Sequence, residues 1–266
     1  MRLVWLDELP LINVPTLPDS VPVSGTGWTV DKIVFVQADV IPEQAIVETE
    51  WAVSLAAQDA RIRAIVAYVP LEKGAAESRA WLDRLKVFPM VRGIRRCVEA
   101  REAGLLTQPD FIAGVKLLPG YQYTFDLCAP AALLGDVIQL VQACPEVQFV
   151  LDHGGNPNIA AKALDPWRAQ MTTLAALPNV RCKLSGLVTN ADPLNWTPPD
   201  LPPYIDHLLS TFGVDRLMFG SDSPVLRLAR STYASWVDVA VGALKALSPA
   251  DLQRVFADNA AAFYRI

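Results

Sequence analysis

The residues best suited to acid–base chemistry stand where two apolar segments of this 266-residue chain end. His153 ends the segment VQFVLDH, directly before two glycines, and Asp222 ends DRLMFGSD. A polar group that ends an apolar run is costly to bury unless it is paired or used. Together, an imidazole and a carboxylate at two such ends are suited to act as an acid/base pair. Taken alone, His153 could be a hydrogen-bonded structural histidine beside a turn. Asp222 alone could be a carboxylate that caps the next helix.

Five further polar residues end or line apolar runs, and we predict that they bind substrate. Arg95 and Arg96 carry the planar guanidinium that matches a carboxylate, but neighbours on a strand point to opposite sides, so at most one faces the site. Lys183 and Ser185 share one face of another run, and Asp126 ends a third.

The elements that must position these residues alternate along the chain. Apolar, β-branched runs predict buried strands, and segments with helical spacing separate them. The expected strands are 32–40, 61–69, 90–98, 123–129, 147–153, 180–187 and 215–222. The expected helices are 42–59, 75–86, 109–118, 133–144, 160–177, 203–212, 231–246 and 249–264. This alternation predicts an α/β fold, a (β/α)₈ TIM barrel, in which functional residues lie at the carboxyl ends of the strands.

Seven strands are one fewer than such a barrel contains. Residues 1–31 hold four prolines and no clear periodicity, so we expect an irregular segment, and RLVWL (2–6) is the only weak strand candidate there. We therefore expect a single barrel domain over 1–266 whose first strand is missing or degenerate.

Composition narrows the class of protein. The net charge is −5 and no basic cluster is present, which argues against binding to nucleic acid or to an anionic membrane. No apolar run is long enough to span a bilayer, and the N-terminus does not resemble a signal peptide. The four cysteines have neither zinc nor redox spacing, so we expect reduced thiols and a cytoplasmic protein.

Several motifs in order resemble one known family. The segments VFVQADVIPEQAIVETEW, VRGIRRCVE, FVLDHGGNP, VRCKLSGLVT, FGSDSPV and NAAAFYRI look like the amidohydrolase-related family of the amidohydrolase superfamily, in the branch of the aldonolactonases, sulfomuconolactonase and pyrone-dicarboxylate lactonase. The resemblance implies a TIM-barrel hydrolase that opens a small lactone, a cyclic carboxylic ester. It also implies that His153 and Asp222 are active-site residues.

The resemblance further implies their roles. Asp222 would be the general base, taking a proton from the attacking water and returning it to the leaving alkoxide. His153 would polarise the carbonyl, directly or by holding a metal. Arg95 or Arg96 and Lys183 would bind substrate oxygens or a carboxylate.

The N-terminal region departs from the family pattern. Members open with a strand that carries His-x-His, whereas WLDELPLINVPTLPD resembles the segment just after that strand, and about a dozen residues, enough for one strand, seem absent. Catalytic zinc usually has about three protein ligands, so we predict no metal, and zinc only where such a strand is restored. Open sheet edges would also invite pairing with another chain, which leaves room for a homo-oligomer.

Two other functions stay open at this point. The chain could be a metal-dependent decarboxylase of the same superfamily, or a truncated barrel without activity. The motifs LSGLVT and FGSDSP favour the lactonase branch by resemblance alone.

Overall fold

A computed structural model describes residues 1–21 and 27–266. Seven strands form one parallel sheet in which each strand pairs with the next along the chain. They are β1 (Ile33–Val36), β2 (Ile62–Tyr68), β3 (Val91–Cys97), β4 (Thr124–Cys128), β5 (Phe149–Leu151), β6 (Val180–Leu184) and β7 (Leu217–Phe219). Every strand falls within a range expected from the sequence. In β2, β4, β5 and β6 most side chains are buried on both faces, which explains their apolar runs, whereas the residues of β1 are half-buried.

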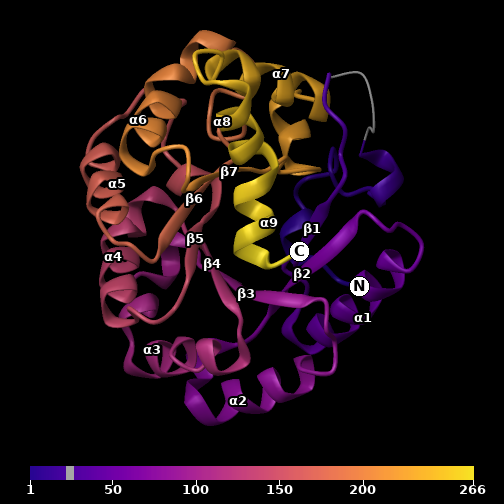
Figure 1. Ribbon diagram of the computed structural model, residues 1–266. Coiled ribbons are helices and arrows are strands. Elements are labelled where there is room, and N and C mark those ends of the chain that lie inside the picture. The colour runs from indigo at the N-terminus through magenta and orange to yellow at the C-terminus, as the bar shows by residue number, and fades with distance from the viewer. Residues whose placement is uncertain (22–26) are drawn as a thin grey trace.

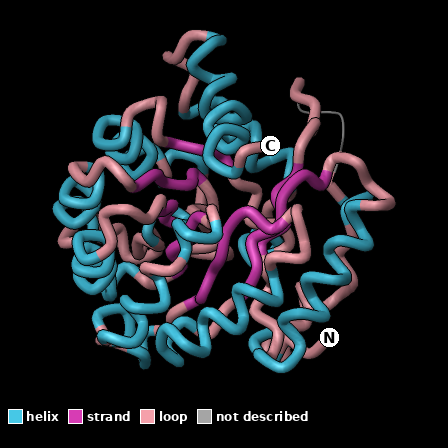
Figure 2. The backbone as a smooth tube through the Cα atoms, turned by 60° about the horizontal axis from the view of Figure 1, so that its bottom comes forward, coloured by secondary structure: helices cyan, strands magenta, loops and turns pink. Residues whose placement is uncertain are grey.

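Helices surround the sheet and complete a TIM-barrel-like α/β fold (Figures 1 and 2). They are α1 (Ala45–Ala56), α2 (Gly74–Leu85), α3 (Pro109–Val115), α4 (Leu134–Ala143), α5 (Trp167–Ala175), α6 (Pro202–Phe212), α7 (Tyr233–Ala243), α8 (Pro249–Gln253) and α9 (Asn259–Tyr264). One helix of the ring follows each strand, as the alternation predicts. No helix within the described ranges combines the length and apolarity that crossing a bilayer requires.

The end of the chain closes one end of the curved sheet. Helix α9 crosses the centre of the ring in Figure 1, and its residues Phe263 and Tyr264 are buried against inward-facing side chains of β2, β5 and β7. Arg265 donates hydrogen bonds to backbone oxygens just before β4 and within β3. These contacts lie at the amino ends of the strands. Residues 263–266, hereafter the floor, therefore cover the amino ends of the strands. A functional site is expected at the opposite, carboxyl ends.

Two local expectations are corrected. The segment RLVWL is not a strand, because Val4–Leu6 forms a 3-10 turn and no strand occurs among the described residues before β1. The helix expected at 160–177 begins only at Trp167, directly after Pro166. A proline lacks the N–H that a helix interior requires and its ring clashes with the preceding turn, so it stands before the helix.

The N-terminal segment is irregular, as expected, and is held by its tryptophans. The indole of Trp5 donates a hydrogen bond of 2.8 Å to the carbonyl of Ala38, just after β1. Trp28 stacks on Phe256 with ring centroids 5.0 Å apart. The part of this expectation that covers residues 22–26 lies outside the described residues. The described part of the segment thus packs along the barrel, and no strand occurs within it.

Candidate active site

His153 and Asp222 both leave their strands in an uncommon backbone conformation. Their φ angles are 54° and 55°, in the left-handed region that few non-glycine residues adopt. The turn after β5 brings the imidazole over the end of β6, where Gly186 lies beneath it. A Cβ atom at Gly186 would lie 2.6 Å from Nδ1 of His153, so only glycine leaves room for the ring.

The ends of β5, β6 and β7 bring these two residues together. Nε2 of His153 lies 3.8 Å from Oδ1 of Asp222, and Nδ1 lies 3.0 Å from the hydroxyl of Ser185. The Thr189 hydroxyl lies 3.2 Å from the other carboxylate oxygen of Asp222. The His153 side chain is 21% exposed and that of Asp222 is 9% exposed, so solvent or a small substrate reaches the imidazole more readily than the carboxylate.

Burial raises the pKa of the Asp222 carboxyl, while His153 and the Thr189 hydroxyl act in the opposite direction. A carboxylate with a raised pKa is a stronger base, and a general base works best when its pKa lies nearer to the operating pH. The environment of Asp222 therefore suits proton abstraction from water.

Three other predicted site residues form a buried network beneath this pair. The Lys183 ammonium lies 2.6 Å from Asp126 and 2.7 Å from Asp152. Arg95 lies 3.1 Å from the other oxygen of Asp152 and donates a hydrogen bond to the backbone carbonyl of residue 37. The hydroxyl of Tyr264, in the floor, donates a hydrogen bond of 2.7 Å to Asp126. Two cations and two carboxylates are thus enclosed together and balance in charge.

The burial and the charges of this network shift the pKa values of its two carboxyl groups in opposite directions. Burial favours a raised pKa at Asp152, but the Lys183 ammonium and the Arg95 guanidinium outweigh it and hold the pKa of this carboxyl below its usual range. Burial raises the pKa of Asp126, which Lys183 only partly opposes. Since Lys183 and Arg95 already face carboxylates of the chain itself, substrate binding by these two residues stays a prediction.

Arg96 points away from this network. Its guanidinium lies 2.6 Å from Glu102 and 3.3 Å from Glu72, both in segments that follow strands. Alternation along β3 places Arg95 in the interior and Arg96 on the other side. The structure brings together His153, Asp222 and Ser185, with Lys183, Asp126 and Arg95 below them, and leaves Arg96 apart.

Sequence reasoning did not assign Asp152, Thr189, Tyr264, Cys97 or Cys128 to this region, where the structure places them. Tyr264 reaches the network from the end of the chain, and no local pattern signals such a contact. Cys97 and Cys128 could have been found, because the two-residue period of a strand puts Cys97 on the same face as Arg95 and Cys128 on the same face as Asp126.

The described residues do not fit a zinc ion well. Cys128, Asp152 and His153 offer ligand atoms within 4.8 Å of one another. Asp152, however, already pairs with two cations, and a divalent metal there would add a third positive charge. The neighbouring Cys97 thiol, together with burial, raises the pKa of the Cys128 thiol, whereas zinc requires a thiolate.

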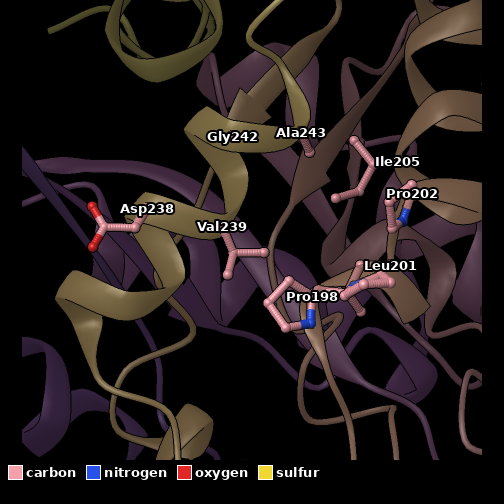
Figure 3. A pocket seen from close by; sticks show the side chains of 9 residues that line it. Pro198, Leu201, Pro202, Ile205, Asp238, Val239, Gly242 and Ala243 are labelled. Atoms are coloured by element: carbon pink, nitrogen blue, oxygen red, sulfur yellow. The ribbon is translucent and has the colours of Figure 1, made fainter.

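A separate groove lies between the loop before α6 and helices α6 and α7. It has a volume of about 540 Å³ and is shown in Figure 3. Its lining is apolar except for Asp238, with residues Pro198, Pro199, Leu201, Pro202, Ile205, Val239, Gly242 and Ala243. It offers no base paired with a hydrogen-bond donor, so we do not assign the reaction to it.

Glu48 on α1 is a buried carboxyl group near the ends of the first strands. It accepts a hydrogen bond of 2.7 Å from the amide of Ala38, and burial raises its pKa to about 7. A raised pKa in the folded state means that Glu48 favours folding below its unfolded pKa, and that this contribution is lost as pH rises through about 7.

We expect Glu48→Gln to raise the melting temperature by several degrees at about pH 9 and by much less at about pH 5. Glutamine keeps an acceptor for the amide of Ala38 and removes the charge. Thermal unfolding at both pH values measures the effect, and Glu50→Gln, an exposed position on the same helix, is the control. A gain that does not depend on pH would contradict the assignment.

The fold and the site together define a TIM-barrel-like α/β protein with acid–base residues at the carboxyl end of its sheet. The sequence profile of the Amidohydrolase family matches residues 22–266, and the chain belongs to this family. The family expected from the sequence motifs is therefore confirmed.

Comparison with individual proteins shows which members of the family this chain resembles. The L-fucono-1,5-lactonase of Burkholderia ambifaria is 32% identical over 244 residues, which cover 89% of this chain and 81% of that protein. The crystal structure of an amidohydrolase from Burkholderia multivorans with bound zinc is 31% identical, with a TM-score of 0.88, over 98% of this chain and 93% of that one. A probable 2-pyrone-4,6-dicarboxylic acid hydrolase from Acinetobacter baumannii, crystallised with citric acid, shares the fold at 16% identity, with a TM-score of 0.68 over 89% of this chain and 84% of that one.

Proposed function

We propose that this protein is a hydrolase that opens a small lactone to its hydroxy acid. The observation that carries the proposal is the approach of His153 and Asp222 to 3.8 Å at the ends of β5 and β7. Two groups of this kind can handle the proton of an attacking water and the charge that develops on the carbonyl oxygen. The relative named L-fucono-1,5-lactonase supports a sugar lactone as the substrate class.

In the proposed reaction, Asp222 accepts a proton as water attacks the lactone carbonyl. The new C–O bond forms while the ring C–O bond breaks, and Asp222 returns the proton to the leaving alkoxide. Nε2 of His153 donates a hydrogen bond to the carbonyl oxygen. Ser185 holds the ring at Nδ1 and so sets its orientation. The carboxylic acid that results ionises, so each turnover releases one proton near neutral pH.

We further propose that the seven strands correspond to the second to eighth strands of a (β/α)₈ barrel, and that residues 1–266 work as one domain. The resemblance to the family supports this numbering, because family members carry a His-x-His strand before the segments that resemble this chain. The DH and GSD motifs at the ends of β5 and β7 would then follow the sixth and eighth strands of such a barrel. A zinc ion would need further ligands, such as the histidines of a His-x-His strand. The reaction steps proposed above involve no zinc ion. The four free thiols support a cytoplasmic location.

The proposal is tested by proton release from a panel of sugar and muconate lactones, with linear esters for comparison. We expect ring opening of at least one lactone, and we expect His153→Asn to lower kcat/KM about 100-fold or more. Asparagine suits the left-handed backbone at this position, so the variant should fold. His207→Gln is the control, because His207 lies on α6 and contacts the carbonyl of residue 168. A chain that opens no lactone, or full activity in His153→Asn, would refute the proposal.

A further inference from the structure

Two cysteines face each other at the carboxyl ends of β3 and β4. Cys97 and Cys128 are register partners at the last position of the two strands. Neighbouring strands lie about 4.8 Å apart, which is within the Cα separation that a disulfide spans. Both side chains are only partly buried, whereas Cys144 and Cys182 are fully buried elsewhere in the fold. The pair therefore has both the spacing and the access that oxidation requires.

The two thiols already interact. The two thiols influence each other's pKa, and the charge of the Arg95 guanidinium acts on both. The neighbouring Cys128 thiol and the positive charge of Arg95 lower the pKa of Cys97, although burial opposes them. Cys97 is also the acceptor of a contact of 3.7 Å from the Gln37 amide. This environment favours a thiolate at Cys97 with a neutral thiol directly beside it, the arrangement of an attacking and a resolving cysteine.

A metal is a poorer occupant for this pair than a sulfur–sulfur bond. Arg95 provides a fixed positive charge beside both sulfurs, and a cation bound there would be repelled by it. A disulfide is neutral and needs no further ligand. The positive charge also assists its formation, since the thiolate is the reacting species.

We propose that Cys97 and Cys128 are a site of reversible oxidation by hydroperoxides, which joins β3 to β4 by a disulfide beside His153. The Cys97 thiolate attacks the O–O bond of hydrogen peroxide, which gives a sulfenic acid and, after protonation, one water. The Cys128 sulfur then attacks the sulfenic sulfur, the S–S bond forms, and the hydroxyl leaves as a second water with the Cys128 proton. Two thiols are oxidised and one peroxide is reduced to two waters.

The site adjoins the proposed catalytic residues without depending on them. The ligand atoms of Cys128 and His153 lie within 4.8 Å of each other, so the cross-link changes the surroundings of the imidazole. Formation of the bond is measured without substrate, and its failure is therefore separate from any failure of lactone hydrolysis.

The experiment uses the full, reduced chain, treated with a slight excess of hydrogen peroxide. We expect the free thiols of the denatured protein to fall from the four of the sequence to half that number, with a monomeric product and recovery on treatment with dithiothreitol. Cleavage before aspartate separates the cysteines, because Asp110, Asp136 and Asp165 divide the sequence between them. Mass spectrometry of this digest should show a single cross-link, between the peptides that hold Cys97 and Cys128.

A variant distinguishes the attacking from the resolving cysteine. Cys128→Ser should form no intramolecular disulfide and should instead trap a dimedone adduct at Cys97. An unchanged thiol count in the wild-type chain, a cross-link that involves Cys144 or Cys182, or disulfide-linked dimers would each overturn the proposal.

Discussion

Asp222→Asn is expected to lower kcat for lactone opening by about 10²–10⁴-fold, the usual contribution of a general base. Asparagine has nearly the same shape and keeps an oxygen near the Thr189 hydroxyl, and it tolerates the left-handed backbone of this position. Only the ability to accept the proton is removed. The loss should therefore appear in kcat, measured by proton release under saturating lactone.

The pH profile gives this prediction a second readout. Because burial raises the pKa of Asp222, the wild-type activity should fall with decreasing pH at a higher pH than an ordinary aspartate would give. The variant should lose that step. Its stability at neutral pH should be equal or greater, since a buried group with a raised folded pKa loses its favourable contribution as pH rises.

Asp215→Asn is the matched control for this change. Asp215 is an exposed aspartate that pairs with Arg254 on the outside of the barrel, and its replacement should leave kcat within about twofold. If Asp222→Asn kept its activity, another residue would have to be the base.

The largest effect on stability is expected from Lys183→Met. The change leaves Asp126 and Asp152 buried with one cation instead of two, and breaking a buried ion pair in this way costs about 3–5 kcal/mol. Methionine fills a similar volume, so the loss of charge rather than of packing dominates. Urea unfolding should show a lower midpoint, and Lys245→Met, an exposed position, should not change it.

A second substitution separates charge from packing. Lys183→Met combined with Asp126→Asn leaves only Arg95 and Asp152, which balance each other. The double variant should recover part of the lost stability. A double variant less stable than the single one would show that the network does not act through its charge balance.

Several features of this protein followed from the sequence alone. The mainly apolar, β-branched runs located all seven strands, because strands of a parallel sheet covered by helices bury most of their side chains. The same runs drew attention to His153 and Asp222, since a charged residue at the end of a buried strand is costly without a use. The alternation of strands and helices predicted the α/β class with a TIM-barrel-like sheet, which the structure has. The motifs predicted the family, which the profile match confirmed.

The partners of the polar residues were decided by the tertiary structure. Lys183 and Arg95 are predicted from the sequence to bind substrate at strand ends, and the structure adds that they pair with Asp126 and Asp152 inside the barrel. Tyr264 meets Asp126 from 138 residues away.

Local periodicity reports whether a side chain points inward. What the side chain contacts there depends on strand register, on the curvature of the sheet and on the C-terminal residues 263–266 that form its floor. For this reason the sequence by itself determined the elements and drew attention to His153 and Asp222 at two strand ends, and only the folded chain decided which charged side chains are paired with one another.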